Sequence, residues 1–448
     1  MSTMSTMSTM SAKPAHRHAK PDPPVGLPRV LQALDGGGPV GLKRHLEVHG
    51  PLPSHRDGRV LADLVEAAGL RGRGGASFPT ATKLRAVSKA RGRAVVVANG
   101  CESEPLSLKD ALLLRELPHL VLDGAAIAAG AVGADEVIVA FEAPNTQARD
   151  SLEQALDERR AARVDSVGFS LFAAEERFLS GQETALISQL GGGPAKPTFV
   201  PPRPTERGLR RRPTLVQNVE TLANLALIAR HGAGWYRELG SEAESGTRLV
   251  TVAGAVKSPG VFEIESGTPL QSLLAAAGGI DGPLVGVLIG GYFGSWLPAG
   301  RISELELSNE ALAHHGAVLG CGAVVALSAD SCPVAETTRV AIYLATETAN
   351  QCGPCVHGTA AIARTLHGVA EGSPSRSAFA DLERWVAELP GRGACHHPNG
   401  LARFVATSLR TFAGQFRDHA ANGPCDACSA EAVLQFPVEQ AHPLAAAA

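Results

Sequence analysis

Residues 94–98 read AVVVA and residues 136–141 read EVIVAF, and these two short runs decide the fold class. Runs of β-branched apolar residues are typical of strands that are buried on both faces of a parallel sheet. Apolar residues at helical spacing fill 112–130 between the runs, and a second helical pattern follows over 146–162. Strands that alternate with helices predict an α/β domain with a largely parallel sheet, which we place at 28–243.

A second unit is expected over 244–332. Residues 249–256 (LVTVAGAV) are strand-like, and Ser258-Pro259-Gly260 is a turn from which 260–264 would return as the second arm of a hairpin. A helix should follow over 268–277, with Thr268 as its N-cap and Pro269 at its first helical position. Two strands followed by a capped helix suit a small β-grasp domain.

A third unit, 333–422, is predicted to be a small helical bundle. Apolar residues recur at three- and four-residue spacing over 356–369, 378–389 and 401–420. Residues 423–448 form a C-terminal tail that contains GPCDACSA. Residues 1–27, which begin MSTMSTMSTM, have no apolar periodicity and are expected to be a disordered leader.

Composition limits the possible functions. The 448 residues suggest roughly three domains. The net charge of −3 gives no basic field, so a nucleic-acid partner is not expected. The apolar runs are too short or too interrupted to predict a transmembrane segment. No signal segment opens the chain, so a cytoplasmic, reducing setting is expected, in which the eight cysteines would be thiols or metal ligands.

A glycine cluster, RGRGGASFP, occupies 71–79 and precedes a plausible helix at 80–87. Glycine allows a ligand to approach the backbone, and the start of a helix offers unpaired N–H groups to a phosphate. Lys83, one turn into this helix, could add a positive charge. The spacing matches neither the dinucleotide fingerprint nor the P-loop, and an ordinary tight loop remains the alternative.

Polar residues follow the AVVVA strand in NGCESEPLSLKD, residues 99–110. Ligands of open α/β sheets bind at strand ends. Glu102 and Glu104 would lie on one side of an extended segment and could face one ligand, although a solvated acidic loop is the alternative. Further along, the arginines of 203–212 outnumber Glu206 and form either a solvated loop or an anion or acidic-partner site.

Two CxxC pairs carry the metal-binding potential of the sequence. Cys352 and Cys355 stand in QCGPC, and Cys395 follows in GACHHP, a pattern that suits an iron–sulfur cluster or zinc. The second pair, Cys425 and Cys428, could be a metal site or a flexible thiol tail. The remaining cysteines, Cys101, Cys321 and Cys332, are predicted to pack as small hydrophobic residues.

Taken in order from about residue 69 to residue 412, these segments resemble the flavin- and NADH-binding subunit of respiratory complex I, the F subunit of the bacterial enzyme. They are also similar to diaphorase subunits of NAD-linked hydrogenases and formate dehydrogenases. The resemblance implies an α/β FMN-binding domain, a β-grasp domain of the soluble-ligand-binding (SLBB) type, and an α-helical bundle that holds a 4Fe-4S cluster.

The resemblance also implies roles for individual residues. It gives FMN contacts to Gly72, Arg73, Gly74, Gly75, Lys83, Asn99, Gln217, Asn218 and Thr221. Gln217 replaces an asparagine of the family but keeps a donor and an acceptor. Glu104 matches the carboxylate that helps to place the nicotinamide over the flavin, Phe78 matches a ring that lines that pocket, and Glu183 matches one of a pair of family glutamates. We interpret these three residues as catalytic. Hydride transfer to FMN would be followed by single-electron transfer through the cluster.

The residues for the nucleotide depart from the family pattern. Val200 stands at a lysine, Arg203 at the phenylalanine that stacks on adenine, and Cys101 at an aspartate. A stacking ring is worth about 1 kcal/mol, and Arg203 could instead pair with a 2′-phosphate. The alternatives are NADH bound with reduced affinity, NADPH, or a protein electron donor. A degenerate FMN-binding relative without dehydrogenase activity is the second reading.

The cluster motif departs too, since Ala349 stands at the first of the four family cysteines. Cys352, Cys355 and Cys395 remain, so the alternatives are a three-iron form, an open iron, or a fourth ligand. Candidates for that ligand are His357, His396, Cys425 and Cys428. Electrons would leave to a ferredoxin or a thioredoxin-like iron–sulfur subunit, in the cytoplasm or at the periphery of a membrane complex. A structural zinc protein using the same cysteines is the third reading.

Overall fold

The first unit is built around a four-stranded sheet. In this computed structural model, which describes residues 26–53 and 57–436, the strand order is β3-β2-β1-β4 and each neighbouring pair is parallel. The strands are β1 (Ala94–Gly100), β2 (Ala134–Glu142), β3 (Gly168–Ala174) and β4 (Thr214–Asn218). The prediction of a parallel α/β sheet is therefore confirmed, whereas β3 and β4 were not predicted. The predicted leader lies almost wholly outside the described residues, and so do 437–448 of the tail.

Helices cover both faces of this sheet. They are α1 (Leu42–His49), α2 (Gly58–Ala68), α3 (Thr80–Lys89), α4 (Lys109–Glu116), α5 (Pro118–Val132), α6 (Thr146–Ala162), α7 (Glu183–Leu190), α8 (Pro204–Arg207) and α9 (Val219–Arg237). The helical spacing over 112–130 does not correspond to one helix. It belongs to two helices, because the chain turns at Leu117 and Pro118 starts α5, where a missing N–H is tolerated.

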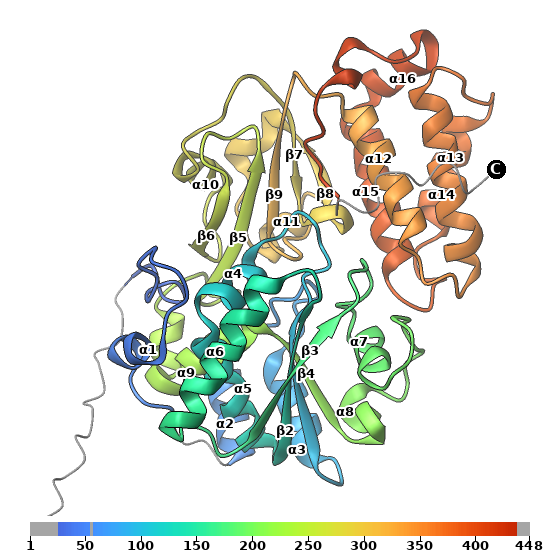
Figure 1. Cartoon of the computed structure of the whole chain (residues 1–448). Helices are drawn as coiled ribbons and strands as arrows, with labels where there is room; N and C mark the ends of the chain where they lie inside the picture. The colour runs from blue at the N-terminus through green and yellow to red at the C-terminus, as the bar shows by residue number, and fades with distance from the viewer. Residues whose placement is uncertain (1–25, 54–56, 437–448) are drawn as a thin grey trace, which may run out of the picture.

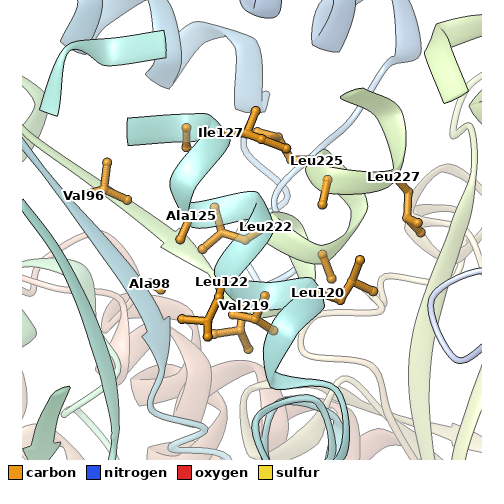
Figure 2. Close-up of a cluster of buried hydrophobic side chains, with 14 of the residues drawn as sticks. Val96, Ala98, Leu120, Leu122, Ala125, Ile127, Val219, Leu222, Leu225 and Leu227 are labelled. Carbon is orange, nitrogen blue, oxygen red and sulfur yellow. The ribbon is translucent and has the colours of Figure 1, made fainter. Parts of the chain in front are cut away.

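Helices α5 and α9 form the centre of the main core. Figure 2 shows side chains of both helices meeting beside Val96 and Ala98 of β1. The two backbones approach closely, since a Cβ added to Gly124 would lie 2.0 Å from the carbonyl oxygen of Leu222. Val95 and Val97 point to the opposite face and pack in a smaller core. Strand β1 is therefore buried on both faces, as its sequence predicts.

The second unit has a five-stranded sheet of order β6-β5-β9-β7-β8. Its strands are β5 (Thr247–Gly254), β6 (Gly260–Glu265), β7 (Leu284–Ile289), β8 (Ser295–Pro298) and β9 (Ala323–Ser328), with α10 (Leu270–Ala276) and α11 (Asn309–Ala313). The predicted hairpin is present as the antiparallel pair β5–β6. Thr268 is not the N-cap of α10: Pro269 holds that place, and the Thr268 hydroxyl donates to the Glu265 carbonyl.

The third unit consists of helices that pack on the second sheet. They are α12 (Pro333–Thr346), α13 (Thr359–Ala370), α14 (Ala378–Glu388), α15 (His397–Thr411) and α16 (Ala413–Asn422). The helix expected over 401–420 is divided at Phe412 into α15 and α16. In Figure 1 the second sheet lies above the first, with these helices to its right. The chain then returns, so that Leu434 is buried in the core shared by the helices and the second sheet.

The first two units share more than a covalent link. Leu249 of β5 belongs to the core of the first unit, and its N–H donates to Glu220 of α9 over 2.9 Å. The carboxylate of Glu263 on β6 accepts the backbone N–H groups of Arg29, Val30 and Leu31 at 2.9–3.0 Å. No helix in the described ranges is long and apolar enough to cross a membrane.

Candidate functional site

The glycine loop lies against the start of α9. A hydrogen bond of 2.8 Å from the Gly72 N–H to the Phe78 carbonyl closes the loop, and the Arg73 N–H donates to the Thr221 hydroxyl over 2.9 Å. A Cβ on Gly74 would come within 3.2 Å of the Asn218 Cβ, and Gly75 has a φ of +106°. Both positions therefore favour glycine for steric reasons. The structure thus brings together Gly72, Arg73, Gly74, Asn218 and Thr221, for which the resemblance implies FMN contacts.

The two strands at this site end side by side. Asn99 of β1 and Asn218 of β4 are Cα partners at the carboxyl ends of their parallel strands. The Asn99 side-chain amide donates to the Gly181 carbonyl over 2.9 Å, and its oxygen accepts the Cys101 N–H. The Asn218 side chain caps α9 by accepting the Glu220 N–H. Both asparagines thus hold in place the loops that surround the strand ends.

Gln217 precedes Asn218 and offers an unused donor. Its side chain is buried, and its Nε2 has no hydrogen-bond partner among the described residues. A buried donor without a partner is unfavourable by about 1–3 kcal/mol. A ligand acceptor at this strand end would remove that penalty, and together with the close glycine loop this donor makes the site fit FMN.

Lys83 and Glu183 are joined across the site. The Lys83 ammonium donates to Glu183 over 2.9 Å and to the Val216 carbonyl over 3.3 Å. An ammonium has three N–H donors, so one remains for a phosphate oxygen. Glu183 is the first residue of α7, whose N-cap is Gln182. Phe78 lies on the glycine loop with 39% of its surface exposed.

Glu104 faces the second sheet. Its carboxyl group accepts the Tyr292 N–H at 2.7 Å and the Leu106 N–H at 3.4 Å. Burial raises the pKa of Glu104 to about 8, although these two hydrogen bonds oppose the shift. The residue lines a cavity of about 240 Å³ together with Phe178, Tyr343 and Phe436. The hydrogen bonds of Glu104 thus lead to the second sheet, whereas Glu183 bonds to Lys83, so the residues interpreted as catalytic are not one hydrogen-bonded group.

A buried charge cluster behind the strand ends was not predicted from the sequence. Lys109 pairs with Asp110 at 2.6 Å and with Glu220 at 3.2 Å, and all three side chains are almost fully buried. Asp110 also accepts the side-chain N–H of Asn218. Burial raises the pKa of Asp110 to about 7 against the opposing charge of Lys109. The signal was available as charged residues directly beside the apolar run ALLL of α4.

Cys352, Cys355 and Cys395 gather at the start of α13 and before α15. The sulfur atoms of Cys352 and Cys355 are 3.5 Å apart, and the backbone N–H of Ala394 bonds to the Cys352 sulfur. Ala349 is buried and supplies no ligand atom. Three thiols without a fourth fit an iron–sulfur cluster that leaves one iron without a cysteine from this motif.

Two of the candidate fourth ligands lie elsewhere. Cys425 and Cys428 do not join this group but converge on Cys332 and His419. Cys332 packs in the core of the helical unit, as predicted, and its sulfur also lies 3.3 Å from Nε2 of His419. The other candidates, His357 and His396, lie beside Cys355 and Cys395 in the chain, and His357 is exposed.

The arginine run is partly neutralised. Arg210 pairs with Glu136 at 3.1 Å, and Arg212 pairs with Asp135 and Glu136. Arg203, Arg207 and Arg211 are exposed. Fewer charges than the sequence suggests are thus available for a partner.

A glycine loop on a parallel sheet, followed by a second sheet and by cysteine-bearing helices, has the parts of an iron–sulfur flavoprotein, and comparison with known proteins supports this class. Family models match three parts of the chain: "Nuo51 FMN-binding domain" over 65–227, "SLBB domain" over 249–283, and "NADH-ubiquinone oxidoreductase-F iron-sulfur binding region" over 335–419. The second NADH-quinone oxidoreductase F subunit of Rhizobium meliloti is 30% identical over 405 residues, which cover 87% of this chain and 94% of that protein. The chain therefore belongs to the family of NADH-quinone oxidoreductase F subunits.

Other relatives agree with this assignment. The NADP-reducing hydrogenase subunit HndC of Solidesulfovibrio fructosivorans is 29% identical, and the match covers 85% of this chain and 80% of that protein. A crystal structure of an air-oxidised NAD+-reducing NiFe-hydrogenase has a TM-score of 0.78 at 30% identity. The match covers 94% of this chain and 69% of the hydrogenase chain. The predictions of the family, of an FMN-binding and a 4Fe-4S region, and of an NADH-dehydrogenase-like iron–sulfur flavoprotein are confirmed.

Proposed function

We propose that the chain accepts a hydride from a nicotinamide nucleotide at FMN and passes single electrons through an iron–sulfur cluster to a partner protein. The observation that supports this most directly is the glycine loop held against the start of α9 and the end of β4, next to Gln217, whose side-chain N–H has no partner among the described residues. Bound FMN supplies the chemistry, because it takes up two electrons together and releases them singly.

The residues of the chain would bind and orient the flavin. The remaining N–H of Lys83 and the start of α3 suit the phosphate, since both present donors to an anion. The Gln217 amide provides a buried donor for a polar atom of the ligand. Gly74 and Gly75 leave room for close approach, while Asn99, Asn218, Arg73 and Thr221 hold the surrounding loops.

Glu104 would act beside the nicotinamide in its protonated form. With a pKa of about 8, it carries an O–H donor at neutral pH. The exposed ring of Phe78 offers an apolar wall, and Glu183 holds Lys83. The cavity next to Glu104 is lined by aromatic rings and also by charged side chains, among them Glu142, Glu176 and Arg177, so it could take a ligand with both apolar and polar parts.

The choice of nucleotide depends on the exposed segment that contains Phe199, Val200 and Arg203. Val200 and Arg203 are exposed and cannot supply the lysine and the stacking ring of the family. Phe199, in the same segment, is 74% exposed and offers a ring for the adenine. The exposed Arg203 suits a 2′-phosphate, so the proposal includes NADPH as an alternative donor to NADH.

We extend the proposal to the remaining units. Units 244–332 and 333–422 would be a β-grasp domain and a helical bundle, and Cys352, Cys355 and Cys395 would hold the cluster. A ferredoxin or a thioredoxin-like iron–sulfur subunit would accept the electrons, in the cytoplasm or at the edge of a membrane complex. The relatives named as subunits of quinone oxidoreductases and hydrogenases support a multisubunit setting.

Anaerobic purification with flavin and iron analysis tests the proposal, followed by titration with NADH and NADPH. We expect bound FMN, cluster iron, and bleaching of the flavin by at least one nucleotide. A Cys352→Ser variant should lose cluster iron but keep flavin bleaching, which separates the two cofactors. Protein that binds flavin normally but is bleached by neither nucleotide would exclude the dehydrogenase activity and would favour the second candidate, an FMN-binding relative. That candidate is favoured by Val200 and Arg203.

A further inference from the structure

Four potential metal ligands meet where the start of α12 and the end of α16 come together in the helical unit. The sulfur atoms of Cys332, Cys425 and Cys428 and a ring nitrogen of His419 all lie within 4.8 Å of one another, and we call this group the Cys332 site. Three separate segments contribute to it. Cys332 precedes α12, His419 lies in the last turn of α16, and the two other cysteines flank Asp426 and Ala427 in the segment that follows. Such convergence from three segments requires the tertiary fold.

The distances in the Cys332 site suit a single tetrahedral ion. The Cys425 and Cys428 sulfur atoms are 3.7 Å apart, and His419 Nε2 lies 3.3 Å from the Cys332 sulfur and 3.8 Å from that of Cys428. Tetrahedral zinc with bonds of about 2.3 Å to sulfur and 2.0–2.1 Å to nitrogen places its ligands about 3.5–3.8 Å apart. These three distances already match a tetrahedral ion, and the remaining ones, all within 4.8 Å, need shifts of about 1 Å or less.

The surroundings orient the ligands. His419 Nδ1 is 3.2 Å from the Ala370 carbonyl, so Nδ1 carries the proton and Nε2 presents its lone pair to the three sulfur atoms. The Cys332 sulfur accepts the Ala335 N–H at the N-terminus of α12, where the helix dipole favours negative charge. The Cys428 N–H bonds to the Cys425 carbonyl and closes the turn between them. The first two bonds favour the ligand forms of His419 and Cys332, and the third holds Cys425 and Cys428 in one turn.

We propose that the Cys332 site binds one structural zinc ion through Cys332, His419, Cys425 and Cys428. Four protein ligands of the Cys₃His type fill a tetrahedral shell and leave no open position, which is typical of structural zinc. The Cys352 group differs, because it offers three thiols and a buried alanine at the fourth place. This inference goes beyond the proposed function and does not depend on it.

The bound ion would fix the start of the returning segment. After Cys428, the Val433 and Leu434 N–H groups donate to the Glu336 carboxylate at 3.0 and 3.1 Å. The Gln435 carbonyl then accepts the Tyr292 hydroxyl, and Phe436 lines the cavity of Glu104. Zinc would thereby join the far end of the helices to the segment that covers this cavity.

Metal analysis of the full-length protein tests the proposal. We expect about one zinc per chain, in addition to cluster iron, in protein purified from cells grown with both metals. Cys428→Ser should lose this zinc and keep its iron, whereas Cys352→Ser should lose iron and keep its zinc. Limited proteolysis should cut the segment after Gly423 at least tenfold faster in Cys428→Ser.

A second variant separates loss of the zinc ion from a general loss of folding. Cys425 is exposed, so Cys425→Ser should leave the packing intact while it releases the ion. Cobalt offered to zinc-free protein should give the absorption of a tetrahedral thiolate complex, and Cys425→Ser should abolish it. Three results would each overturn the proposal. The wild-type protein could contain no zinc, or zinc could persist in both Cys425→Ser and Cys428→Ser. The third result is that the site holds iron instead, seen as additional iron that Cys425→Ser and Cys428→Ser lose.

Discussion

Replacing Glu104 with glutamine tests whether this side chain is a neutral acid at physiological pH. Burial raises its pKa from 4.5 to about 8. Between these values the unfolded chain releases the proton while the folded protein keeps it. The wild-type protein therefore loses stability as pH rises from about 4.5 to about 8, and the loss levels off above that. Glutamine does not titrate, so the Glu104→Gln variant escapes this loss.

The magnitude follows from the shift. A change from 4.5 to about 8 corresponds to an upper bound of about 5 kcal/mol. For a unit of 150–250 residues, 1 kcal/mol moves Tm by about 2–4 °C. Some water reaches real interiors, so we expect the Tm advantage of the variant over the wild type to grow by about 5 °C or more between pH 5 and pH 8. At pH 5 the variant should be equal or slightly less stable, because the amide adds a donor that needs a partner.

Thermal unfolding of both proteins at half-unit steps of pH is the assay. Glu142, whose pKa burial also raises to about 8, is present in both proteins, so its contribution cancels in the difference. Glu242→Gln, at an exposed position, is the matched control and should follow the wild type at every pH. A Tm difference that stays constant from pH 5 to pH 8 would refute the reasoning, because Glu104 would then be ionised in the folded protein.

Three further predictions concern packing and ligand binding. Gly124→Ala should lower the free energy of unfolding by about 2–3 kcal/mol or prevent folding, because its Cβ would lie 2.0 Å from the Leu222 carbonyl. Gly414→Ala, in the open space of α16, should be neutral or stabilising in the same thermal assay. Gln217→Leu should weaken FMN binding about tenfold in a flavin fluorescence titration, since a donor worth about 1.4 kcal/mol is lost, and an unchanged Kd would show that this amide does not meet the flavin. Phe199→Ala should raise the KM for the nucleotide by about fivefold with little change in kcat; an unchanged KM would mean that the ring does not stack on adenine.

The parallel sheet could be predicted from the sequence because its central strands are continuous apolar runs. AVVVA and EVIVAF became β1 and β2 as predicted. Strand β3 (GFSLFAA) lies at the sheet edge and is mostly half-exposed, so it shows no such run. Strand β4 ends in Gln217 and Asn218, whose polar character hid a strand that occupies the other edge.

The candidate site could be predicted where its residues are close together in the sequence and form a local pattern. The glycine loop and residues 216–221 (VQNVET), which include Gln217, Asn218 and Thr221, are local patterns, and the structure joins them through Arg73 and Thr221. Contacts between distant segments could not be read in this way. Nothing local connects Cys332 with Cys428, and nothing local connects Glu104 with the Tyr292 N–H. Such pairs depend on how the three units are packed, which periodicity and spacing do not encode.

The link between the glycine loop and the second sheet has a consequence for the order of synthesis. The Arg73 guanidinium is buried and donates to the Thr247 carbonyl over 2.9 Å and to the Tyr236 hydroxyl over 3.0 Å, and Thr247 lies 174 residues later in the chain. A nascent chain that has left the ribosome only as far as α9 therefore offers Arg73 the Tyr236 hydroxyl but not yet the Thr247 carbonyl. The glycine loop therefore gains its full set of hydrogen bonds only after β5 has been synthesised, so this part of the first unit matures only once the second unit has begun to form.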